Sequence, residues 1–226
     1  MATQQQKTPE VDVLLSKSEA FIEKNSRKLL YGVGGVAAII ALIVAIQHLY
    51  LIPREQQAAV ALFRGEQFFQ EDSFSLALNG NGADFEGMAY IADHYGSTAS
   101  GNLAKAYAGI CSFHLGDYEG ALKYLKGFDA SDRMAAPVVT GLIGDCYANL
   151  GEVEKAIGFF EKAARQANND LISPLYLKKA GIAYEHIEKY EEAAKAYAAI
   201  KEKYYTSPEA DDIEKYITRA TLRSSH

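Results

Sequence analysis

The chain lacks tryptophan, has only two cysteines and five prolines among its 226 residues, and contains no segment in which apolar and polar residues alternate as in a half-buried strand. Frequent alanine and helical periodicity instead predict an all-α protein. The sequence also lacks a P-loop, an H-E-x-x-H or G-x-S-x-G motif, and any Cys/His cluster with metal-ligand spacing. We therefore expect no enzyme, no cofactor and no metal site. An enzyme built on an unrecognised site is the remote alternative.

Charge is missing from one long stretch near the N-terminus, "LLYGVGGVAAIIALIVAIQHLYLI" at residues 29–52. A helix of this length spans roughly 36 Å, enough to cross a bilayer core of about 30 Å. A buried helix of a soluble domain is usually shorter and carries a polar stripe. A cleaved signal peptide has an apolar core of only about 7–15 residues. The stretch therefore predicts a retained transmembrane anchor, which contacts membrane lipid.

Basic residues are unevenly distributed around this anchor. Lys24, Arg27 and Lys28 precede it closely, whereas Arg54 and Arg64 follow it more sparsely. Lys and Arg are retained on the cytoplasmic side of a membrane. The bias predicts that residues 1–28 are cytoplasmic and that residues 53–226 lie on the opposite side.

The segment 53–226 has no basic cluster. It contains 18 Lys and Arg against 25 Asp and Glu, so its formal charge is 18 − 25 = −7. Phosphate backbones are bound by concentrated Lys and Arg. We therefore expect no nucleic-acid partner.

Three stretches of this segment repeat one pattern: "YAGICSFHLGDYEGALKYLKGF", "LIGDCYANLGEVEKAIGFFEKAA" and "KAGIAYEHIEKYEEAAKAYAAI". The positions in register are Gly109, Gly144 and Gly181; Gly116, Gly151 and Glu188; Ala121, Ala156 and Ala193; and Leu125, Phe160 and Tyr197. The periods are 35 and 37 residues, and the pattern resembles the tetratricopeptide repeat, a pair of antiparallel helices that stacks into an α-solenoid. The expected units are a degenerate repeat at 53–101, repeats at about 102–136, 137–173 and 174–208, and a capping helix at 209–222.

The small residues have a physical reason in this pattern. Two helices of a pair approach closely only where side chains are small, which predicts contacts between each first-helix glycine and the alanine of its partner helix. The second glycine ends the first helix in a left-handed conformation. Because Glu188 replaces that glycine in the third copy, we expect its turn to differ slightly. We also expect the Asn-Gly pairs of the insertion "SFSLALNGNG" to mark a turn, and Ser207 to cap the last helix.

Cys111 and Cys146 occupy the same position in adjacent repeats. A disulfide requires Cα atoms about 4.4–6.8 Å apart, whereas packed helix axes lie about 8–10 Å apart. We therefore favour two buried free thiols over a disulfide.

Solenoids of this class bind partners along the face formed by the first helix of each repeat. Counting along the motif, that face comprises Leu103, Ile110, Phe113, His114, Val138, Asp145, Asn149, Leu175, Lys178, Ile182, Glu185 and His186. Only Lys178 is basic, so a C-terminal carboxylate is a poor ligand for it. An apolar groove instead fits a protein or peptide that presents hydrophobic anchors. The alternative is that Ile110, Phe113 and Ile182 pack under a neighbouring helix.

The stretch "FIEKNSRKLLYGVGGVAAI" resembles the N-terminal anchor of the YfgM-like family. The matching positions are Phe21, Glu23, Asn25, Lys28, Leu30, Gly32 and Val33. "DHYGSTASGNLAKAYAGICSFHLGDYEGAL" is similar to envelope tetratricopeptide proteins of the Bacteroidota. These resemblances imply a single-pass bacterial inner-membrane protein with a periplasmic repeat domain, whose partners are the SecYEG translocon and periplasmic chaperones or nascent chains. A scaffold of cell-wall or secretion machinery is the alternative.

Overall fold

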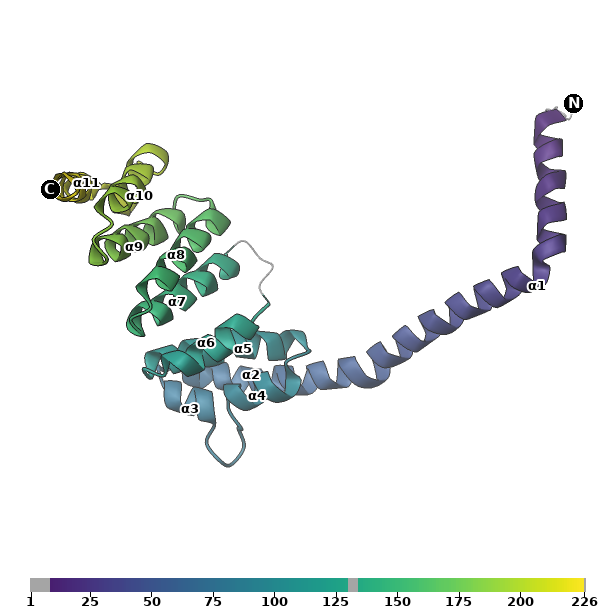
Figure 1. Ribbon diagram of the computed structural model, residues 1–226. Helices are drawn as coiled ribbons and strands as arrows, with labels where there is room; N and C mark the ends of the chain where they lie inside the picture. The colour runs from purple at the N-terminus through teal and green to yellow at the C-terminus, as the bar shows by residue number, and fades with distance from the viewer. Residues whose placement is uncertain (1–8, 130–133, 226) are drawn as a thin grey trace, which may run out of the picture. The chain divides into compact units, whose positions relative to one another are not determined.

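The computed structural model describes residues 9–129 and 134–225, with side chains from Lys24 onward (Figure 1). Every regular element in this part of the chain is a helix. Contacts divide the chain into two compact units, residues 1–53 and 54–226. Because residues 1–8 and 130–133 are not described, the predicted segments 1–28 and 102–136 lie partly outside the described residues.

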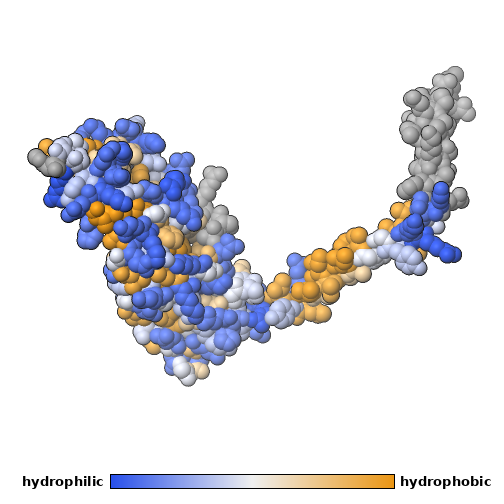
Figure 2. All heavy atoms as spheres, in the orientation of Figure 1, coloured by the Kyte–Doolittle hydropathy of each residue, from blue (hydrophilic) through white to orange (hydrophobic). Residues whose placement is uncertain are grey.

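The first unit is one long helix followed by a wider turn. Helix α1 covers Pro9–Ile46, and a π-helical turn, η1, covers Gln47–Leu51. Pro53 cannot donate to the carbonyl of Leu49, and this missing bond explains a departure from α-helical geometry just before it. Apart from half-buried Leu51, the large apolar side chains of residues 29–52 are exposed, and Figure 2 shows this apolar stretch by hydropathy. This helical stretch has the length and composition to cross a membrane, which is compatible with a single span.

The second unit is a succession of helix pairs. Its helices are α2 (Ile52–Gln70), α3 (Phe74–Asn79), α4 (Met88–Tyr95), α5 (Ala99–His114), α6 (Tyr118–Gly127), α7 (Ala135–Asn149), α8 (Val153–Ala167), α9 (Ser173–His186), α10 (Tyr190–Lys203) and α11 (Ile213–Ser224). Helices α5 with α6, α7 with α8, and α9 with α10 are antiparallel neighbours in the three clear repeats (Figure 1). Apolar residues from neighbouring helices form the core between them.

The first-helix glycines lie where the two helices of a pair come closest, but their main contact is a large side chain. A Cβ added to Gly144 would lie 2.7 Å from the ring of Phe160, and one added to Gly181 would lie 2.3 Å from the ring of Tyr197. On the second helix of each pair, an alanine lies four residues before this large side chain, for example Ala156 before Phe160. These alanines are fully buried. Each glycine therefore provides the space that the partner helix fills with an aromatic ring, or with a leucine in the first copy.

The turns between the two helices of a pair share one left-handed residue and one closing hydrogen bond in all three copies. Gly116, Gly151 and Glu188 have φ values of 80°, 78° and 60°, so the glutamate adopts the left-handed conformation too. The following residue closes each turn onto the first helix, for example Lys189 N–H to the Tyr184 carbonyl at 2.9 Å. The third turn differs slightly, as predicted: Ile187 before Glu188 has φ −104° and ψ 22°, whereas Leu115 and Leu150 have φ −83° and −79° and ψ −2°. The hydrogen-bonded closure is nevertheless retained.

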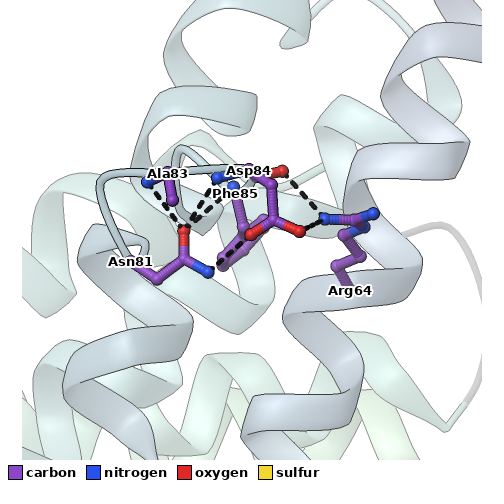
Figure 3. Close-up of polar contacts among 5 residues, drawn as sticks. All are labelled: Arg64, Asn81, Ala83, Asp84 and Phe85. Atoms are coloured by element: carbon purple, nitrogen blue, oxygen red, sulfur yellow. Dashed lines mark hydrogen bonds and ion pairs between the residues drawn. The ribbon is translucent and has the colours of Figure 1, made fainter.

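Most of the insertion before its Asn-Gly pairs forms a short helix, α3, that the sequence pattern did not predict. The Asn-Gly pairs lie where the chain leaves this helix and enters the loop of residues 80–87 before α4. In that loop the Asn81 side-chain oxygen accepts from the backbone N–H groups of Ala83, Asp84 and Phe85, while Arg64 pairs with Asp84 (Figure 3).

The C-terminal helix also starts later than predicted. The Ser207 side chain makes no capping bond, a 3₁₀ turn covers Pro208–Ala210, and α11 begins only at Ile213. The intervening aspartates end the 3₁₀ turn, and Asp212 N-caps α11 by position rather than through a side-chain bond.

Both cysteines are free and fully buried. Burial raises the pKa of each thiol to about 11, with Asp145 adding a smaller contribution at Cys146. The thiolate form is therefore scarce at neutral pH, and both groups behave as small core residues.

Candidate partner-binding face

A row of exposed apolar side chains runs across the first helices of the three repeats. Leu103 on α5, Val138 on α7 and Leu175 on α9 are 39%, 46% and 40% exposed. They occupy equivalent positions, 35 and 37 residues apart. Their shared position and similar exposure mean that each repeat presents one apolar group at the same point of its first helix.

A second set of predicted residues lies two helical turns further along the same helices. Ile182 is 48% exposed, whereas Ile110 is half-buried. Asp145 occupies the middle position and is half-buried as well. The second set is therefore apolar at its two ends and polar at its centre.

The charged residues of this face are used in contacts between successive repeats. Both carboxylate oxygens of Asp145 accept from Lys179 Nζ at 2.7 Å, linking α7 to α9. Glu185 accepts two bonds from Arg219 on α11, at 2.8 and 3.2 Å. Because these charges are already paired within the chain, they offer little free charge to a partner.

Lys178 makes a third contact of this kind. Its Nζ donates to Asp212 at 2.8 Å, and Lys215 also bonds the same carboxylate. The hydrogen bond from Lys178, followed by that from Lys215, lowers the pKa of Asp212 to about 2. The basic residue predicted to face a ligand thus joins α9 to the last helix.

The remaining predicted residues lie near the C-terminal ends of the first helices. Phe113 is half-buried and packs edge-on against Tyr118, while His114 stacks on Phe74 with ring centroids 4.2 Å apart. Asn149 is exposed and donates to the Asp145 carbonyl of its own helix, and His186 is exposed. Of this group, Phe113 and His114 contribute to packing between neighbouring segments.

Sequence reasoning missed the cationic and acidic partners Lys179, Asp212 and Arg219. A signal was present, because residues 145 and 179, 178 and 212, and 185 and 219 are oppositely charged and each pair is separated by 34 residues. In a repeat protein, a separation close to the period places two residues on adjacent equivalent helices. Leu171, 68% exposed just before α9, was also missed.

The described side chains include no group of three or more His, Cys, Asp or Glu positioned to hold a metal ion. The face presents exposed apolar side chains beside charged residues that are paired within the chain.

Residues 140–172 match the tetratricopeptide repeat family model. No curated protein matches the chain significantly. Two solved structures are similar in fold. One, described as kinesin light chain nearly identical TPR-like repeats from Podosopora anserina, is 11% identical with a TM-score of 0.55, covering 76% of this chain and 88% of the other. A crystal structure of MamA protein is 14% identical with a TM-score of 0.51, covering 74% and 92%. The chain is an all-α protein with a tetratricopeptide-like solenoid fold.

Proposed function

We propose that this chain is a non-catalytic protein-interaction module that is anchored in a membrane by residues 29–52 and binds a partner through the first helices of its repeats. The observation that carries the proposal is the row formed by Leu103, Val138 and Leu175. Three apolar side chains held about 40% exposed at equivalent positions offer regularly spaced anchor sites. A peptide or helix with hydrophobic anchors complements such a face.

The distribution of charge on the same helices supports an apolar partner. Asp145, Lys178 and Glu185 are engaged with partners 34 residues away in the chain. A strongly charged ligand would have to break these pairs, whereas an apolar one leaves them intact. Exposed apolar residues beside charged residues that are already paired within the chain therefore favour a ligand that binds through its own hydrophobic side chains.

The proposed location is the bacterial inner membrane, with the N-terminus cytoplasmic and the repeat domain periplasmic. Support comes from the uncharged helix, the basic residues that precede it and the likeness of the anchor to the YfgM-like family. In this setting the domain assists translocated or envelope proteins near the SecYEG translocon.

Substitutions on the face test the binding site directly. Val138→Asp and Leu175→Asp should abolish partner capture without unfolding the domain, because both side chains are already partly in water. A charge in a contact that closes over it costs on the order of 2–5 kcal/mol of binding free energy. Leu222→Asp is the matched control, since Leu222 is exposed on α11 and outside the row. Ile182→Asp should behave like Val138→Asp, whereas half-buried Ile110→Asp should also reduce stability.

Circular dichroism and pull-down from membranes in mild detergent provide the two measurements. Folded Val138→Asp and Leu175→Asp chains that capture their partner as the parent does would place the binding site elsewhere. Site-specific crosslinking in intact membranes identifies the partner. Adducts with translocon subunits or nascent chains support the proposed setting, and adducts with cell-wall or secretion proteins replace it with the scaffold alternative.

Protease treatment tests the topology. In spheroplasts, added protease should digest residues 53–226 and leave a membrane-bound stub. Digestion only after lysis would reverse the orientation.

A further inference from the structure

The N-terminal helix of the repeat stack, α2, has the internal register of the later first helices. Gly65 of α2 lies against the side chains of Phe85 and Met88, as Gly109 lies against Leu125 and Gly144 against Phe160. Aligning these glycines with Gly181 as well places Val60 of α2 in the position of Ala104, Val139 and Tyr176, and Phe63 in that of Tyr107, Leu142 and Lys179.

In the later repeats these positions face the preceding repeat and are covered by it. Ala104 is fully buried in the cluster shared with α2 and α4, and Tyr176 is buried against Gly141 of α7. On α2, no earlier repeat lies among the described residues. Val60 and Phe63 are accordingly 71% and 61% exposed, although terminal repeats of solenoids usually carry a polar outer face.

The four charged residues of α2 each contact a residue of its own domain, although the Arg64 side chain remains 47% exposed. Arg54 donates to the His94 carbonyl, the Glu55 carboxylate accepts from Ser100, and Arg64 pairs with Asp84 (Figure 3). The fourth, Glu66, lies beside Tyr107, where burial and then this carboxylate raise the pKa of the phenol.

The outward strip of α2 is therefore free of charge. It consists of Gln56, Val60, Phe63, Gln67 and Gln70, all exposed and separated by four, three, four and three residues. This alternation is the spacing of a helix–helix seam. The opposite end of the stack differs, because α11 exposes Glu214, Lys215, Arg219 and Arg223.

We propose that this strip of α2 packs in parallel against the same strip of a second copy of the chain. In a two-fold contact each residue faces its own equivalent, so any charge would meet a like charge. The strip has none, and a glutamine amide carries both a donor and an acceptor and can pair with its own copy. Copies anchored in one membrane share their orientation, which makes the parallel arrangement the accessible one. Two apolar residues per copy form a small contact, so confinement to the membrane supplies the effective concentration.

Cysteine crosslinking of the full chain in lipid vesicles tests this contact. The native thiols are buried, so the parent chain provides the background. Phe63→Cys and Gln67→Cys should give a dimer-sized disulfide adduct on oxidation, because facing seam residues lie within disulfide reach. Leu222→Cys, equally exposed on α11, is the matched control and should give at least about tenfold less. Adding Val60→Glu to Phe63→Cys should suppress the adduct while circular dichroism stays unchanged.

Three results would overturn the proposal. They are no adduct at either α2 position, equal yields at Phe63→Cys and Leu222→Cys, and an adduct unaffected by Val60→Glu. The same variants oxidised in native membranes provide a second readout. A dimer of the chain supports self-association, whereas an adduct of another mass shows that a different protein covers α2. Because the strip lies outside the row of Leu103, Val138 and Leu175, these outcomes are independent of the proposed partner binding.

Discussion

The second and third repeats, α7–α8 and α9–α10, reach the same backbone arrangement with different residues at one key position. Both keep a glycine where the helices meet, Gly144 and Gly181, and each glycine accommodates an aromatic ring. At the turn, however, Gly151 is replaced by Glu188, and both residues have positive φ. At the helix contact, only a residue without a Cβ leaves room for the aromatic ring. At the turn, glycine is preferred for its positive φ, but a glutamate can adopt the same conformation where the closing hydrogen bond is formed.

The largest expected effect comes from filling the helix contact. Gly144→Leu places a side chain where the Phe160 ring already lies, 2.7 Å from the added Cβ. Overpacking a core costs about 1–3 kcal/mol or more in the free energy of unfolding, and native domains hold only about 5–15 kcal/mol. Gly181→Leu should do the same against Tyr197. Chemical denaturation of the full chain in detergent, followed by circular dichroism, measures both losses.

Gly158→Ala is the matched control for a glycine inside a helix. It lies on the exposed side of α8, and an added Cβ would contact nothing within 4 Å. Alanine is favoured over glycine by up to about 1 kcal/mol in a helix interior, so this variant should gain stability. A Gly144→Leu chain as stable as the Gly158→Ala chain would refute the steric argument.

A reciprocal exchange at the turns should give a smaller effect of opposite sign in the two repeats. Gly151→Glu should lose about 1–2 kcal/mol, because a side chain disfavours the left-handed conformation and no neighbour lies within 4 Å to compensate. Glu188→Gly should gain stability, because glycine adopts the left-handed conformation without this cost. The gain is reduced by the conformational entropy that glycine adds to the unfolded chain. Denaturation midpoints of both variants measure the exchange. Loss of stability in Glu188→Gly would mean that the glutamate side chain itself stabilises the third turn.

The same contrast shows how far the sequence predicts this molecule. The all-α solenoid fold was predicted correctly because small residues recur at periods of 35 and 37 residues. The left-handed Glu188 was not anticipated, because a hydrogen bond from Lys189 N–H back to Tyr184 holds the turn, and such closure depends on the folded backbone. Helix α3 was missed because the Asn-Gly pairs at and after its C-terminal end predict a turn, and the six residues of the helix give only a weak helical pattern beside them.

For the candidate face, helical counting predicted the exposure of some positions but not the contacts that the charged residues make. Helical counting identified Leu103, Val138 and Leu175 as outward-facing, and all three are exposed. Counting within one helix did not reveal that Asp145 bonds to Lys179 on α9, or that Lys178 bonds to Asp212 at the start of α11. Those contacts depend on how far successive repeats are offset, which emerges only when the helices stack.

The smallest expected effect concerns the link between the third repeat and the last helix. Lys178, and then Lys215, lower the pKa of Asp212 to about 2 by hydrogen bonding to its carboxylate. A group whose pKa is lower in the folded state stabilises the fold above its unfolded pKa of about 4. That contribution is lost as the pH falls from about 4 to about 2. Asp212→Asn should therefore be less stable than the parent at neutral pH, with the difference shrinking as the pH falls toward about 2 and vanishing only below it.

Glu154→Gln, an exposed carboxylate removed from the second repeat, is the matched control for loss of one negative charge. Its difference from the parent should be smaller than that of Asp212→Asn at neutral pH, because no resolved contact between repeats is lost with it. Thermal melting of the three chains across this pH range measures both differences. If Asp212→Asn keeps the same deficit at pH 2 as at neutral pH, the loss comes from helix α11 itself. The bond from Lys178 would then not be what joins α9 to the end of the solenoid.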